Sequence, residues 1–296
     1  MSDLIRMVHA GEMTYTVVDS LAYLVNRHIY PRARKAFDIA QPQPTAWAFA
    51  SHSDGTLLNA ANTFLNGYID SGKLASLEQQ LFAQIENFSV GDSQRLGQLV
   101  ARRLPKYEQM FRATAQRFDM DWALLAAVAY QESHWNPKAR SPTGVRGLMM
   151  LTLDTAKEMK VSNRLDASQS LEGGAAYLVK LKARLPKRIT EPDRTLLSLA
   201  AYNVGFGHLE DARVLTSRSG KNPDLWVDVR AHLPLLSKKQ FYSTVKYGYA
   251  RGNEPVLYVD NIQYYRTYLQ LYSLSQHDFE PPPKTPDLDS GAPTSL

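Results

Sequence analysis

Hydrophobic positions recur with a helical period over most of residues 105–275. Residues 105–118, "PKYEQMFRATAQRF", place apolar side chains at helical spacing. Residues 122–133 are almost wholly apolar, follow Asp121 as an N-cap candidate and stop before Asn136-Pro137. A helix that is apolar on all sides is typical of the interior of a domain.

Similar patterns predict more helices further along the chain. Residues 168–185 have an apolar periodic face, and residues 191–205 have Pro192 at the start and Gly205 past the end, the usual asymmetry of a helix. Together with the preceding helices, these segments predict an all-helical domain over residues 105–275. The other predicted helices cover residues 152–159, 209–216, 224–232, 238–247 and 255–273.

The first part of the chain mixes two periods. Residues 13–20 and 44–51 are rich in β-forming residues between turn residues, so they predict strands. Residues 57–82 predict two helices. This mixture indicates a partial α/β lobe over residues 1–85, too short to cover a sheet, joined to the helical domain by a linker at residues 86–104.

Composition narrows the classes of function. The 296 residues carry Lys+Arg 34 against Asp+Glu 29, a net charge of only +5, without a basic run or an RNA-binding aromatic motif, so no nucleic-acid partner is expected. The absence of cysteine excludes disulfides, thiolate metal sites and a cysteine nucleophile. The histidines show no metal-binding spacing, so no metal or other cofactor is expected. The Pro-rich tail, residues 276–296, is predicted to be disordered.

Location is a separate question. The sequence has no apolar run of about 18 residues that could span a bilayer, and its N-terminus lacks the apolar core of a signal peptide. Taken alone, these features predict a cytoplasmic chain. The resemblance described below changes that prediction.

Glu132 is the main candidate for chemistry. A carboxylic acid among side chains such as Ala127 and Tyr130 is poorly solvated as an anion, so its pKa is expected to rise. A carboxyl that keeps its proton near neutral pH can act as a general acid for glycosidic bond cleavage. The alternative is a structural ion pair with Lys138 or Arg140, which is the more common role of such a carboxylate.

The segment "GVRGLMMLT" follows Glu132 closely. Gly144 and Gly147 allow backbone to approach a ligand, and Met149 and Met150 offer a soft apolar surface. Two adjacent methionines are, however, more often core filling. This segment alone therefore leaves the choice open.

A second polar group follows the helix at residues 191–205. There, Asn203 beside Tyr202 can bond an amide or a sugar hydroxyl, although a helix C-cap is its commoner role. Asp154 is the nearest second carboxylate to Glu132, and its "TLDT" setting better fits a charge in the first turn of a helix.

Four short motifs resemble those of the family-1 lytic transglycosylases, in the same order. They are Glu132-Ser133, Gly147-Leu148-Met149-Met150, Ala201-Tyr202-Asn203 and Glu254-Pro255-Val256-Leu257-Tyr258-Val259. The resemblance implies a goose-type lysozyme-like helical fold over residues 105–275. The form "GLMMLT", with Met150 where many relatives carry Gln, is similar to the membrane-bound lytic murein transglycosylase F group.

The resemblance also implies an activity. Members are lytic exotransglycosylases, which are lyases of cell-wall turnover that cleave the bond between N-acetylmuramic acid (MurNAc) and N-acetylglucosamine (GlcNAc) without water and leave 1,6-anhydromuramyl ends. No metal or cofactor takes part. The implied roles are acid and then base for Glu132, orientation of the acetamido group for Ser133 and Asn203, cleft lining for Gly147, Met149 and Tyr202, and support of the catalytic end for Tyr258.

Two other classes remain open from the residues alone. A lysozyme-type muramidase, which is a hydrolase, would need a positioned water and usually a second acid. A non-catalytic peptidoglycan-binding module would need no acid, so the presence of Glu132 disfavours it.

Residues 1–85 resemble the second lobe of solute-binding proteins of the amino-acid type. The resemblance implies that Asp19 binds the amino group of an amino-acid or muropeptide ligand in a longer protein. It also places most of the first lobe and a signal sequence before Met1. We therefore expect a periplasmic protein, peripheral on the outer membrane of a Gram-negative bacterium, whose main partner is the glycan strand of peptidoglycan.

Overall fold

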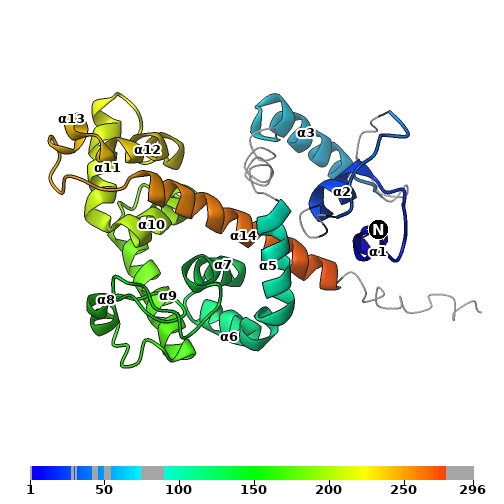
Figure 1. Ribbon diagram of the computed structural model, residues 1–296. Coiled ribbons are helices and arrows are strands. Elements are labelled where there is room, and N and C mark those ends of the chain that lie inside the picture. Colours follow the sequence, from blue (N-terminus) through cyan, green and yellow to red (C-terminus); the bar gives the residue numbers. More distant parts are fainter. Residues whose placement is uncertain are drawn as a thin grey trace, which may run out of the picture.

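The chain folds mainly as α-helices in the computed structural model, which describes residues 2–27, 30, 32–41, 46–49, 55–74 and 90–277. Figure 1 shows α1 to α3 on one side and α5 to α14 on the other. The helices are α1 (Ser2–Ala10), α2 (Ser20–Asn26), α3 (Thr56–Asp70), α5 (Val90–Arg102), α6 (Leu104–Arg117), α7 (Trp122–Ser133), α8 (Leu153–Glu158), α9 (Ala167–Arg184), α10 (Asp193–Val204), α11 (Phe206–Arg218), α12 (Trp226–His232), the 3₁₀ helix η1 (Leu233–Ser237), α13 (Lys239–Tyr242) and α14 (Asn253–His277). The prediction of a mainly helical fold is confirmed. No helix in these described ranges is both long and apolar enough to cross a membrane.

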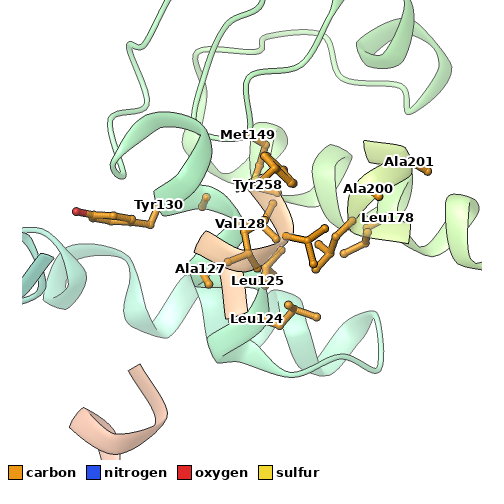
Figure 2. Close-up of a cluster of buried hydrophobic side chains, with 14 of the residues drawn as sticks. Leu124, Leu125, Ala127, Val128, Tyr130, Met149, Leu178, Ala200, Ala201 and Tyr258 are labelled. Atoms are coloured by element: carbon orange, nitrogen blue, oxygen red, sulfur yellow. The ribbon is translucent and has the colours of Figure 1, made fainter. Parts of the chain in front are cut away.

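Helix α7 forms the centre of the larger group because it has no polar face over most of its length. Every residue from Ala123 to Tyr130 is at most 4% exposed. Helices α6 and α14 pack against it. Figure 2 shows its side chains gathered with Leu178 of α9 and Ala200 of α10. The end of α7 is therefore held by the core of the domain.

The long helix α14 is tied to the start of α7 by polar contacts. Asp121 caps α7 by accepting a hydrogen bond from the backbone N–H of Ala123 at 2.9 Å. Its other carboxylate oxygen accepts bonds from Arg266 at 2.6 Å and Gln270 at 3.0 Å, both on α14. The two helices are thereby fixed against each other at one end.

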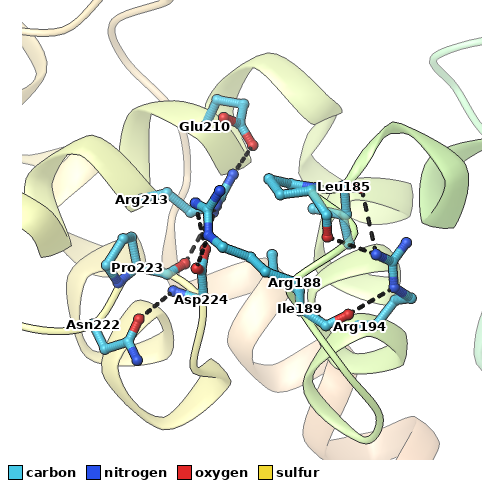
Figure 3. A network of polar contacts seen from close by, with 10 residues as sticks. Leu185, Arg188, Ile189, Arg194, Glu210, Arg213, Asn222, Pro223 and Asp224 are labelled. Atoms are coloured by element: carbon cyan, nitrogen blue, oxygen red, sulfur yellow. Dashed lines mark hydrogen bonds and ion pairs between the residues drawn. The ribbon is translucent and has the colours of Figure 1, made fainter.

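Two guanidinium groups, the half-buried Arg194 and the buried Arg213, connect helices and loops elsewhere in this group of helices. Arg194 of α10 donates to the carbonyls of Ile189 at 2.9 Å and Pro186 at 2.6 Å, beyond the C-terminus of α9, where carbonyls lack helical partners. Arg213 of α11, 6% exposed, donates to Asp224 at 2.6 Å. Figure 3 shows both groups bridging loops to helices. Such pairs fix the loops between α9 and α12.

The strands predicted in the first part of the chain are not observed among the described residues. Residues 13–20 run as irregular chain until α2 begins, and residues 46–49 are also without a strand. A strand needs a paired neighbour, and an isolated β-rich segment does not supply one. The α/β character expected for residues 1–85 is therefore absent from their described part.

Two other elements differ from the predicted ones. Residues 90–102 form α5, whose Leu96 and Val100 are buried in the common core, where a linker was predicted. The helix predicted for residues 238–247 shortens to α13, and a loop leads on to α14. Predictions for residues 44–45, 50–51, 75–89 and 278–296, including most of the tail, lie outside the described residues.

Candidate active site

Glu132 lies in the last turn of α7, where a sharp turn takes the chain out of the core. His134 and Trp135 both have left-handed backbone conformations, with φ of 50° and 57°. Such residues persist only where their surroundings impose the conformation, and they cluster at functional sites. Here Trp135 is 1% exposed, and its indole Nε1 donates to the carbonyl of Ala126 at 2.8 Å. The turn therefore fixes Glu132 at the end of its helix.

The phenol of Tyr258 is hydrogen-bonded to the carboxyl of Glu132. The Tyr258 hydroxyl donates to Glu132 Oε1 at 2.6 Å, and Tyr258 is 4% exposed. Burial raises the pKa of Glu132 to about 7, while the bond from Tyr258 lowers it by less. Among the described residues, neither Lys138 nor Arg140 contributes to the pKa of Glu132, so the ion pair considered from the sequence is not observed.

The side chain of Ser133 is hydrogen-bonded within the protein. It is 7% exposed, and its hydroxyl lies 2.8 Å from the carbonyl oxygen of Leu148 and 3.1 Å from that of Ala129. A hydroxyl has one proton to donate, so these carbonyls already occupy it. Ser133 therefore connects the end of α7 to the segment that contains the two methionines.

That segment is shaped by Gly147 and by a buried methionine. Gly147 has a φ of 90°, and a Cβ there would lie 1.7 Å from the carbonyl oxygen of Arg164. Met149 is fully buried against Gly174 of α9, which differs from the prediction that its side chain lines a cleft. The partly exposed Met150, with a φ of 46°, is the methionine available to a ligand.

Tyr202 and Asn203 lie in the last turn of α10, with different surroundings. The Tyr202 hydroxyl donates to the carbonyl of Met149 at 3.0 Å, and its ring stacks on that of Tyr258 with centroids 6.4 Å apart. The side chain of Asn203 is exposed, and Gly205, with a φ of 88°, caps the helix in its place. Asn203 is thus free of the capping role considered from the sequence.

The structure brings most of the predicted residues together. A continuous set of contacts runs from Glu132 to Tyr258, Tyr202 and the backbone of Met149. It lies where α14 packs against both α7 and α10. The site is therefore built on rigid elements rather than on a mobile loop.

Two other candidate carboxylates, Asp154 and Asp19, lie at the starts of helices. Asp154 is exposed in the first turn of α8, as its sequence context indicated. Asp19 is the N-cap of α2, and its Oδ1 accepts the N–H of Ala22 at 2.6 Å. Within the described ranges, no group of three or more His, Cys, Asp or Glu residues could hold a metal ion.

One residue that shapes the site was missed from the sequence. Arg103 lies between α5 and α6, and its guanidinium donates to the carbonyl of His134 at 2.7 Å. It supports the left-handed turn after Glu132 from outside α7. Its neighbours in sequence include Arg102, and nothing in that local pattern separates it from an ordinary surface cation.

Tyr258→Phe tests the link between Tyr258 and Glu132. The phenol stabilises the ionised form of Glu132, so its removal should raise the pKa of Glu132 above about 7. If Glu132 must be protonated to act, activity falls as pH rises through that pKa, and the alkaline limb of the pH profile should move to higher pH. Turnover should fall by about tenfold or less. An unmoved alkaline limb in a folded variant would contradict the assignment.

Comparison with known proteins adds to this geometry. The family model described as Transglycosylase SLT domain matches residues 109–225. A protein named Membrane-bound lytic murein transglycosylase F from Saccharophagus degradans is 52% identical over 267 residues, which cover 90% of this chain and 53% of that protein. Proteins of the same name from Hahella chejuensis and Cellvibrio japonicus are 47% and 50% identical, covering 89% and 90% of this chain and 52% and 54% of their own lengths. The chain thus spans about half the length of these relatives.

Proposed function

From the match of residues 109–225 to the transglycosylase SLT domain, we propose that the chain cleaves the glycan strands of peptidoglycan without consuming water. The observation that carries the proposal is the carboxyl of Glu132, whose raised pKa of about 7 is set by burial and by Tyr258. No neighbouring carboxylate within the described residues contributes to that pKa. The relatives are named as lytic murein transglycosylases, which supports the same substrate.

The proposed reaction uses one carboxyl twice. Glu132 first donates its proton to the oxygen that links MurNAc C1 to GlcNAc, and the C1–O bond breaks. The 2-acetamido group of MurNAc supports the charge that develops at C1, as in other substrate-assisted enzymes. The ionised Glu132 then takes the proton of the MurNAc 6-hydroxyl, whose oxygen bonds to C1. The products are a 1,6-anhydromuramyl end and a GlcNAc with a free 4-hydroxyl.

The other site residues are assigned by their exposure. We assign Asn203 to hydrogen-bond a sugar amide, because its side chain is exposed. Met150 offers apolar contact. Ser133, Gly147 and Met149 act through the backbone that they hold, since their side chains are buried or absent. Tyr202 and Tyr258 are positioning residues for this backbone and for Glu132.

Digestion of purified sacculi in water labelled with heavy oxygen tests the proposal. If the MurNAc 6-hydroxyl is the nucleophile, the released fragments should carry no label at C1. A lysozyme-type hydrolase would place one labelled oxygen there. A non-catalytic binding module would release no fragments at all.

Asp154→Asn tests the hydrolase alternative directly. If Asp154 were a second catalytic carboxylate, the variant should lose nearly all activity. We expect cleavage of sacculi to stay within a few-fold of the unaltered chain, because Asp154 lies exposed in the first turn of α8. A folded but inactive Asn variant would favour the hydrolase.

The envelope is the proposed location. The relatives are named as membrane-bound, which supports an envelope-associated protein, and we propose the periplasmic face of the outer membrane.

An amino-acid or muropeptide ligand for the first part of the chain is a separate proposal. Asp19 is exposed and uses only Oδ1 to cap α2 in the described contacts, so Oδ2 is the oxygen that would meet a ligand ammonium group.

A further inference from the structure

The segment between α13 and α14 carries exposed aromatic and cationic side chains that the proposed reaction does not use. Tyr247 is 53% exposed and Tyr249 is 57% exposed. Lys246 is exposed, with its ammonium 5.3 Å from the centre of the Tyr247 ring. Arg251 keeps 75% of its side chain exposed while it pairs with Glu254 at 3.2 Å. We call residues 246–251 the tyrosine loop.

A buried carboxylate holds this loop in place. Asp211 of α11 is 3% exposed and accepts backbone N–H bonds from Lys246 at 3.1 Å, Tyr247 at 2.7 Å and Gly248 at 3.0 Å. A buried charge is tolerated only with such partners. A surface fixed in this way loses little conformational entropy when it binds a ligand. Asp211 is therefore a positioning residue for the loop.

The loop also packs against the start of α11, which follows the candidate active site in the sequence. The Tyr247 ring lies so close to Gly207 that a Cβ there would be 2.7 Å from it. Gly207 is near the start of α11, a few residues after Asn203. In the other direction the loop enters α14, so the Cα atoms of Tyr249 and Tyr258 can be at most about 23 Å apart. The loop is thus a neighbour of the site rather than part of it.

We propose that the tyrosine loop is a second contact surface for the peptidoglycan glycan strand, beyond the sugars that meet Glu132. This inference rests on the proposed function. It identifies a surface that a long glycan strand would contact outside the active site. Tyrosine supplies rigid, amphipathic contact area at low entropic cost, which suits the faces of sugar rings. The exposed ammonium of Lys246 complements the carboxylates of muramyl groups and stem peptides, and the exposed pair of Arg251 with Glu254 can exchange partners with them.

Co-sedimentation with purified sacculi tests the surface without cleavage if every variant carries Glu132→Gln. Tyr247→Ala combined with Tyr249→Ala should raise the Kd about fivefold or more, the scale of losing a contact tyrosine. Phe at both positions keeps the rings and should retain most of the binding. Tyr15→Ala, at a residue 81% exposed outside the loop, is the matched control and should not change the Kd.

An unchanged Kd in the folded Ala variant would overturn the proposal. The proposal would also be overturned if the Ala variant bound phosphatidylglycerol vesicles more weakly but bound sacculi as before. That result would assign the loop to membrane binding. Because sedimentation needs no turnover, failure of the proposed cleavage would leave the binding result intact.

Gly207→Ala provides an independent variant that keeps both tyrosines. The new methyl group would displace the Tyr247 ring, so binding should weaken in the same direction. In the active chain, kcat/KM should fall more for intact strands than for a short soluble muropeptide. Equal losses on both substrates would instead make the loop part of the catalytic geometry and would overturn the proposal.

Discussion

Glu132→Gln should reduce the cleavage of purified sacculi by at least about a hundredfold, the usual scale of general acid–base assistance. The amide keeps the shape of the side chain and can still meet Tyr258, but its N–H protons are not acidic enough to transfer and it cannot take up a proton as a carboxylate does. Both proposed steps therefore fail together. Release of soluble muropeptides measures the loss, and circular dichroism checks the fold.

Glu108→Gln is the matched control for this substitution. Glu108 lies on α6, 36% exposed, and pairs at the surface with Arg112. The same chemical change there should leave cleavage within about twofold, because exposed ion pairs contribute little. Near-normal turnover of folded Glu132→Gln would show that another group carries the proton.

Gly147→Ala should lower the free energy of unfolding by at least about 3 kcal/mol. Gly147 has a φ of 90°, and its new Cβ would lie 1.7 Å from the carbonyl oxygen of Arg164, a backbone atom that cannot rotate away. The segment that carries Met149 and Met150 would have to move, and cleavage should fall with it. Chemical denaturation and sacculus digestion measure the two effects.

Gly144→Ala separates backbone strain from the steric clash. Gly144 has a φ of 88°, but no heavy atom lies within 4 Å of a Cβ placed there. Only the left-handed conformation is penalised, at about 1–2 kcal/mol. If Gly147→Ala costs no more than Gly144→Ala, the close approach to Arg164 is not a constraint on the site.

The helical elements near the site could be predicted because their signals are local. The apolar run of α7, its cap at Asp121 and the stop before Pro137 lie within one short segment. The same is true of α10, with Pro192 and Gly205 at its ends. Local periodicity and capping chemistry decide such boundaries.

The contacts that complete the site could not be predicted from local patterns. Tyr258 meets Glu132 across 126 residues of sequence, and only the packing of α14 on α7 brings them together. Adjacent methionines look alike in sequence, yet Met149 is buried against Gly174 while Met150, with a φ of 46°, is partly exposed. Asp211 resembles a surface acid until the loop after α13 folds over it.

The β-rich segments show the opposite failure. Strand propensity at residues 13–20 is a local signal, but a strand is defined by a partner that this part of the chain does not provide in the described structure. For residues 90–102 the sequence predicted a linker, but the structure has a helix there. Tertiary packing of Leu96 and Val100 makes this helix part of the core.

Mass spectrometry of the muropeptides released from purified sacculi tests the central claim most directly. If Glu132 is both acid and base and the MurNAc 6-hydroxyl is the nucleophile, the new ends should be 1,6-anhydromuramyl groups, and the Glu132→Gln protein should release almost none. New ends that are reducing muramic acid, one water heavier, would contradict the mechanism and identify a hydrolase.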